Sequence, residues 1–99
     1  MDTAVSAETQ EKIAQILDSY VAEKKIDYHA LRTRQAGARK FVSVHILVPD
    51  DWTVQKGHEL TEEIENEICA AISDSIVFTH LEPLEDPSSF YDLELFRRK

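Results

Sequence analysis

The stretch Phe41-Val-Ser-Val-His-Ile-Leu-Val48 decides the fold of this chain, because its side chains alternate in character from one residue to the next. In a β-strand, successive side chains point to opposite faces. One face is therefore wholly β-branched, with Val42, Val44, Ile46 and Val48. The other face is mixed, with Phe41, Ser43, His45 and Leu47. Because β-branched residues favour strands, the pattern predicts a strand over 41–48.

A second strand precedes this one. Residues 26–34 alternate, with Ile26, Tyr28 and Ala30 expected on one face and Asp27, His29 and Leu31 on the other. The connecting residues 35–38 contain Gly37, which is the expected site of a positive φ in a tight turn. Two strands joined by so short a turn predict an antiparallel hairpin.

Two amphipathic helices flank the hairpin. The first is predicted over 7–24, with Ser6 as its N-cap and apolar residues at helical spacing: Ile13, Ile16, Leu17, Tyr20 and Val21. The second is predicted over 54–73, with Thr53 as its cap and an apolar stripe at every fourth position: Leu60, Ile64, Ile68 and Ile72. Cys69 on this helix is expected to be a small core residue.

A third strand, 76–82, ends at Pro83 and completes the order α-β-β-α-β. This order predicts an α+β sandwich of the ferredoxin-like type, with two helices on one face of a three-stranded sheet. Residues 1–6 form a lead-in. The tail at 87–99 is rich in apolar residues; it is either a short helix docked on the domain or on a partner, or a mobile end, and docking is favoured.

Composition limits the function. Ninety-nine residues fit one domain, and Lys+Arg 11 against Asp+Glu 19 gives a net charge of -8. Nucleic-acid binders normally carry a basic footprint, so the charge argues against a nucleic-acid partner. A single cysteine forms no intramolecular disulfide, and no stretch approaches the roughly 18–20 apolar residues that span a bilayer.

His80 and Glu82 are the most informative candidate site residues. They stand two positions apart in a strand, so they share a face and could bind one divalent cation together. In the predicted sheet, His29 and His45 could be near neighbours of His80, and His58 could approach from the rim. Taken singly, each histidine also fits an ordinary role, as a surface residue or a partly buried one.

Catalytic motifs are weak. Glycine occurs twice, so no phosphate-cradling loop is present, and His58-Glu-Leu-Thr-Glu62 lacks the second histidine of the zinc-protease helix. A metal-dependent hydrolase with Glu59 or Glu82 as its base is therefore a remote alternative, and no enzyme activity is expected.

Four segments together carry a family resemblance. They are Tyr28-His-Ala-Leu-Arg-Thr-Arg-Gln-Ala-Gly37, Phe41-Val-Ser-Val-His-Ile46, Val54-Gln-Lys-Gly-His58 and Phe78-Thr-His-Leu-Glu-Pro83. In order and spacing, over roughly residues 10–85, they resemble the cytoplasmic C-terminal domain of cation diffusion facilitator transporters. The resemblance implies a metallochaperone-like α-β-β-α-β fold.

The resemblance also implies a ligand set and partners. The matching positions in zinc-transporting members bind a pair of zinc ions near a dimer interface: His29, His45, His58, His80 and Glu82. Glu82 stands where the family usually carries Asp. Zinc or another divalent transition metal is the expected cofactor. A homodimer and the transmembrane domain of the same transporter are the expected partners, on the cytoplasmic side of a membrane.

On this reading, residues 1–6 are the linker from a missing transmembrane domain and 7–86 are a metal-binding regulatory domain. Such domains form a V-shaped dimer. Two chains bring together about 16 negative charges, twice the formal -8, so bound cations would relieve repulsion and favour closure. A stand-alone metal buffer or carrier with the same ligands is the alternative.

Overall fold

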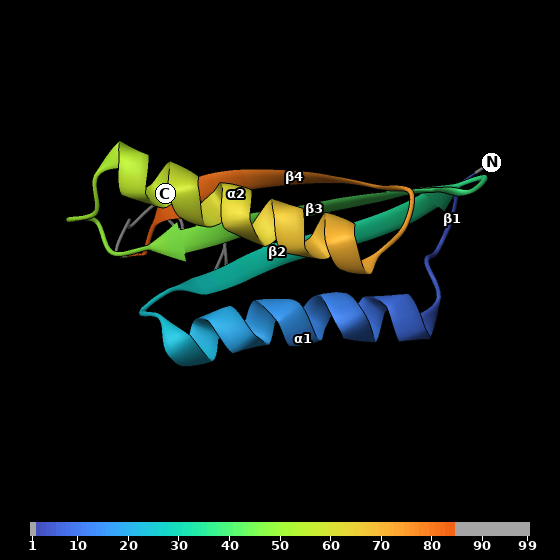
Figure 1. Cartoon of the computed structure of the whole chain (residues 1–99), viewed down its shortest axis with the longest axis horizontal. Helices are drawn as coiled ribbons and strands as arrows, with labels where there is room; N and C mark the ends of the chain where they lie inside the picture. Colours follow the sequence, from blue (N-terminus) through green and yellow to red (C-terminus); the bar gives the residue numbers. More distant parts are fainter. Residues whose placement is uncertain (1, 85–99) are drawn as a thin grey trace, which may run out of the picture.

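Two helices lie against one face of a twisted sheet in the computed structural model of this chain (Figure 1). The structure describes residues 2–84, so the tail predicted at 87–99 lies outside the described part. The elements, in chain order, are β1 (Asp2–Thr3), α1 (Ala7–Glu23), β2 (Asp27–Ala36), β3 (Arg39–Val48), α2 (Val54–Ala71) and β4 (Ser75–Pro83). The predicted α-β-β-α-β order is confirmed.

The sheet has the strand order β1-β2-β3-β4. Strands β2 and β3 form the predicted antiparallel hairpin, and Gly37 has the expected positive φ, 62°. Strand β4 runs parallel to β3, so the connection between them must cross over, and α2 forms that crossover. The sequence did not indicate β1, whose two residues pair with Ala36 and Gln35 at the edge of the sheet.

Both helices begin at the predicted caps. The Ser6 side chain accepts a hydrogen bond from the backbone N–H of Thr9 at 3.1 Å. At α2, the Thr53 side chain accepts from the N–H of Lys56 at 3.0 Å. Each bond satisfies one of the N–H groups that a helix leaves without a partner in its first turn.

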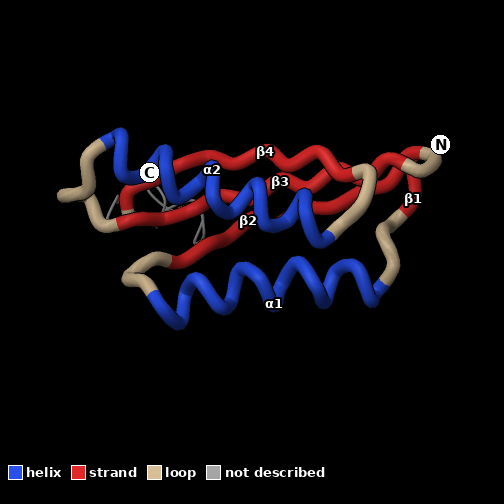
Figure 2. The backbone as a smooth tube through the Cα atoms, viewed as in Figure 1, coloured by secondary structure: helices blue, strands red, loops and turns tan. Residues whose placement is uncertain are grey.

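The core lies between the helices and the sheet. The residues of β3 predicted to share an apolar face are all buried there, and α1 and α2 cover them with fully buried residues: Ile13, Leu17, Ile64 and Ile68. The two helices run in opposite directions along the same face of the sheet (Figures 1 and 2). The opposite face has no helix over it in the described residues, and we call it the open face.

A β-bulge in β2 changes which residues share a face. His29 pairs with His45, whereas Arg32 pairs with Ser43, so three steps along β2 match two steps along β3. Ala30 takes up the extra residue with a φ of 56°. Leu31 consequently packs against the core together with Tyr28. The predicted alternation, which placed Leu31 with His29, is therefore wrong beyond His29.

Cys69 is exposed, so its prediction as a core residue is also wrong. It follows Ile68 directly on α2, and one residue turns a helix by about 100°, which carries the side chain away from the buried stripe. Its Sγ lies 3.8 Å from the carbonyl oxygen of Ser75.

Tyr20 joins the two helices through its hydroxyl group. The Tyr20 hydroxyl donates to Glu67 at 2.7 Å and lies 3.2 Å from Glu63, both on α2. Burial and these two carboxylates raise the pKa of Tyr20. Tyr28 donates to Asp18 at 2.8 Å, and burial followed by this bond raises the pKa of Tyr28 to about 12. Both hydroxyls therefore stay protonated donors near neutral pH.

We expect Tyr20→Phe to lower the free energy of unfolding by about 1 kcal/mol, because a hydrogen bond to charged groups is lost from a buried ring. Tyr28→Phe is the matched control and should cost about half as much, because its bond lies at an exposed position. Urea denaturation at pH 7 measures both. Equal losses would show that the Tyr20 bonds do not tie α1 to α2.

We expect Ala30→Gly to stabilise the fold by roughly 0.5–1 kcal/mol. Glycine removes the penalty of a positive φ, and its greater freedom in the unfolded chain offsets part of that gain. Ala36→Gly, in the same strand but without a positive φ, should instead destabilise the fold. If both substitutions destabilise the protein in urea denaturation, Ala30 carries no strain.

Candidate metal centre

Three histidines form a row across the open face of the sheet. His29 of β2 pairs with His45 of β3, and His45 pairs in turn with His80 of β4. Paired residues of neighbouring strands point to the same face. The bulge at Ala30 follows His29 directly, so it leaves this row intact and shifts only the residues after it.

Glu82 brings two of these imidazoles together. Its Oε2 lies 2.7 Å from Nδ1 of His45, and its Oε1 lies 3.2 Å from Nε2 of His29. The rings of His29 and His45 meet edge to face, with centroids 5.1 Å apart. One carboxylate thus bridges two histidines that stand on different strands.

This cluster can hold a metal ion. Among the described residues, His29, His45 and Glu82 are grouped with one ligand atom each within 4.8 Å of the others. Donors around tetrahedral zinc lie about 3.3 Å apart, given metal–ligand distances of roughly 2.0–2.1 Å. Small side-chain rotations close that difference. The three side chains are 20–32% exposed, so an ion can reach them from solvent.

His80 lies beside the cluster. Its ring stacks on that of His45 at 4.7 Å with 19° between the planes. Because β3 lies between β2 and β4, His80 lies on the far side of His45 from His29. The structure therefore places His80 next to His45, but its ligand atoms are not part of the cluster of His29, His45 and Glu82.

His58 is not brought to the cluster within one chain. It lies on α2, where its Nε2 is 3.4 Å from Glu62, and both side chains are largely exposed. The helices cover the face of the sheet opposite to the histidine row. Any contact between His58 and such a cluster would have to come from a second chain.

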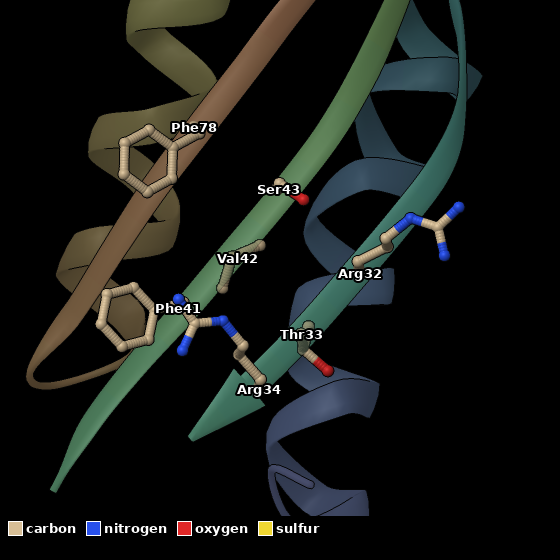
Figure 3. Close-up of a pocket in the computed structure, with 7 residues that line it drawn as sticks. All are labelled: Arg32, Thr33, Arg34, Phe41, Val42, Ser43 and Phe78. Atoms are coloured by element: carbon tan, nitrogen blue, oxygen red, sulfur yellow. The ribbon is translucent and has the colours of Figure 1, made fainter. Parts of the chain in front are cut away.

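A groove beside the histidine row was not foreseen from the sequence. It measures about 260 Å³ and runs over the open face between β2, β3 and β4, with the helices behind the strands (Figure 3). Arg34 stacks on Phe41 with its guanidinium carbon 4.0 Å from the ring centroid. Phe78 is 55% exposed in the same groove. Phe41 and His45 fall on the same face of the predicted strand, so the sequence pattern could have indicated an aromatic surface beside the histidines.

Residues 5–84 match the family model of the cation efflux protein cytoplasmic domain. The chain belongs to this family. An uncharacterised transporter of Synechocystis is 54% identical over 68 residues, which cover 69% of this chain and 22% of that protein. The chain spans about a quarter of the length of the curated relatives it matches.

Solved structures of this family share the fold. The zinc form of CzrB is 31% identical, with a TM-score of 0.73 over 84% of this chain and 93% of that one. The metal-bound C-terminal domain of the CzcD transporter from Thermotoga maritima is 27% identical, with a TM-score of 0.71 over 80% of this chain and 91% of that one. The solved structures that share this fold thus include a zinc form and a metal-bound domain.

The family description places such domains in the cytoplasm, and the relatives named above include transporters rather than enzymes. Neither helix in the described part of the chain is long and apolar enough to cross a membrane.

Proposed function

We propose that this chain is the metal-sensing cytoplasmic domain of a divalent-cation efflux transporter. The observation that carries the proposal is the cluster of His29, His45 and Glu82 on the open face. Membership of the cation efflux family supports it, because the cargo of such a protein is a cation that a cytoplasmic domain can also bind.

Zinc is the proposed ion. Two imidazole nitrogens and one carboxylate oxygen form a donor set that suits zinc and other late first-row metals better than magnesium or calcium. Each imidazole nitrogen now faces an oxygen of Glu82. An entering cation would satisfy the same groups, with neutral imidazoles as its ligands. His80, stacked on His45, is the proposed ligand of a second ion.

The proposed active form is a homodimer that meets over the open face. This face carries the exposed Phe78 and the groove beside it, which a second copy would cover. Two chains, each with a formal charge of -8, repel one another. Cations held at His29, His45 and Glu82 would reduce that repulsion, and His58 of the second copy is the proposed further ligand.

Metal binding would then shift the dimer towards a closed arrangement. A ligand shifts such an equilibrium only by its different affinity for the two states. In the proposed scheme this difference arises because the closed dimer adds a ligand and lowers the repulsion between the chains. The transmembrane part of the same transporter is the proposed recipient of the change.

Calorimetric zinc titration tests the site. We expect His45→Ala and Glu82→Gln each to weaken zinc binding by more than about tenfold, since even residues that only orient metal ligands cost 10–100-fold. Glu59→Gln is the matched control, with the same change of charge on exposed α2. If both cluster variants bind zinc as tightly as the wild type, the cluster is not the zinc site.

Small-angle scattering and analytical ultracentrifugation test the dimer. We expect zinc to reduce the radius of gyration of the wild-type dimer, and Phe78→Asp to weaken dimerisation because it places a charge in the proposed interface. Ala70→Asp, an exposed substitution on α2, should leave dimerisation unchanged. A Phe78→Asp protein that dimerises like wild type would show that the chains do not meet over the open face.

A further inference from the structure

A second groove lies at the end of the sheet where α1 and β4 finish and α2 begins, and we call it the strand-end groove. Figure 1 shows that these ends lie on the same side of the molecule. Its volume is about 740 Å³. Four separate segments form it, and its lining residues are Lys24, Lys25, Pro49, Asp50, Asp51, Trp52, Lys56 and Leu84. It is distinct from the groove beside the histidines, whose lining residues are all different.

Exposed apolar side chains gather at this end of the molecule. The described residues include four large hydrophobic side chains that are exposed, and three of them are here: Val54 at 82%, Leu81 at 38% and Leu84 at 38%. Val54 and Leu81 line a smaller groove that shares Trp52 with the strand-end groove. Apolar surface that is gathered in one place on a soluble domain usually has an occupant.

The groove carries charges of both signs, with three lysines and two aspartates, Asp50 and Asp51, among its lining residues. Lys24 and Lys25 line it directly after α1, and within residues 2–84 neither forms an ion pair. The ammonium group of Lys56 lies 4.3 Å from the centre of the Trp52 ring. An occupant should therefore combine carboxylates with aromatic or aliphatic side chains.

The chain itself supplies such a segment. Residues 85–99 follow Leu84, which lines the groove and whose N–H donates to the carbonyl oxygen of Val48. The segment carries four acidic residues and five large apolar ones, and it ends in three basic residues: Glu85, Asp86, Asp92 and Glu94, with Phe90, Tyr91, Leu93, Leu95 and Phe96, then Arg97, Arg98 and Lys99. Six residues span about 20 Å when extended, so Phe90 can reach any part of the groove.

We propose that residues 85–99 dock into the strand-end groove of their own chain. The aromatic pair Phe90-Tyr91 packs on Trp52 and the neighbouring aliphatic side chains, and the carboxylates face Lys24 and Lys25. A tethered segment binds at an effective concentration in the millimolar range, so modest contacts suffice. The tail of a second copy has no such tether and would have to bind from free solution.

Paramagnetic broadening in the full-length chain tests the proposal. The chain has one tryptophan, so its indole N–H gives a single NMR signal that reports on the groove. A nitroxide is attached to Ser89→Cys in a Cys69→Ser background. We expect loss of the Trp52 indole signal and its recovery when ascorbate reduces the nitroxide. A signal that survives beside the active nitroxide would overturn the proposal.

A mixed sample separates the tail from a second copy. Isotope-labelled chain without a nitroxide is combined with unlabelled chain that carries one. We expect the Trp52 signal to remain intact in this mixture. Loss of the signal there would show that the tail of another copy occupies the groove, which contradicts docking within one chain.

Groove and tail variants then test the contacts. Lys24→Glu with Lys25→Glu, and separately Phe90→Ser with Tyr91→Ser, should restore the Trp52 signal in the spin-labelled chain. Lys12→Glu with Arg39→Glu is the charge-matched control away from the groove and should leave the signal lost. The dispersion of the amide spectrum confirms that each variant is folded. If the signal stays lost in both the groove and the tail variants, the proposed contacts are wrong.

Discussion

The alternation of β3 is the constraint on which the rest of the structure depends. Its even-numbered residues from Val42 to Val48 are buried under both helices, which fixes the face that the helices cover. The odd-numbered residues must then lie on the open face, and His45 is among them. A shift of one residue would place His45 in the core and valines in solvent, so the burial of this one strand also fixes the position of the candidate metal centre.

The cluster itself depends on pairing partners rather than on any local motif. His29, His45 and Glu82 come from three strands, and only their common register brings the ligand atoms within 4.8 Å. Glu82 stands two residues beyond the histidine row on a strand whose neighbour is β3, yet its side chain is long enough to reach both His45 and His29. The carboxylate therefore makes a cluster out of residues that the backbone alone leaves in a simple row.

Local signals predicted the helices and the hairpin well, because Ser6, Thr53 and Gly37 mark boundaries through their own backbone chemistry. The bulge at Ala30 had no such signal, since alanine rarely adopts a positive φ and only the tertiary pairing holds it there. Strand order in the sequence could place His29, His45 and His80 near one another, and the two-residue spacing could place Glu82 on the face of His80. The sequence could not show that His58 lies on the opposite side of the sheet from the cluster, because its position depends on the face of the sheet against which α2 packs.

The distance between the cluster and the start of the domain limits how metal could act. The partners of His29 and Ala36 on β3, His45 and Arg39, stand six positions apart, and a strand rises about 3.3 Å per residue, so the cluster lies roughly 20 Å from Ala36, where β1 pairs. A bound ion cannot influence β1 by direct contact over that length. A close-packed core transmits displacement with little internal deformation, so in the proposed dimer a change at the cluster would reach the other end as a rotation of the whole domain against its partner. In that proposed scheme the dimer would be the sensing unit, because a single domain has no partner to rotate against.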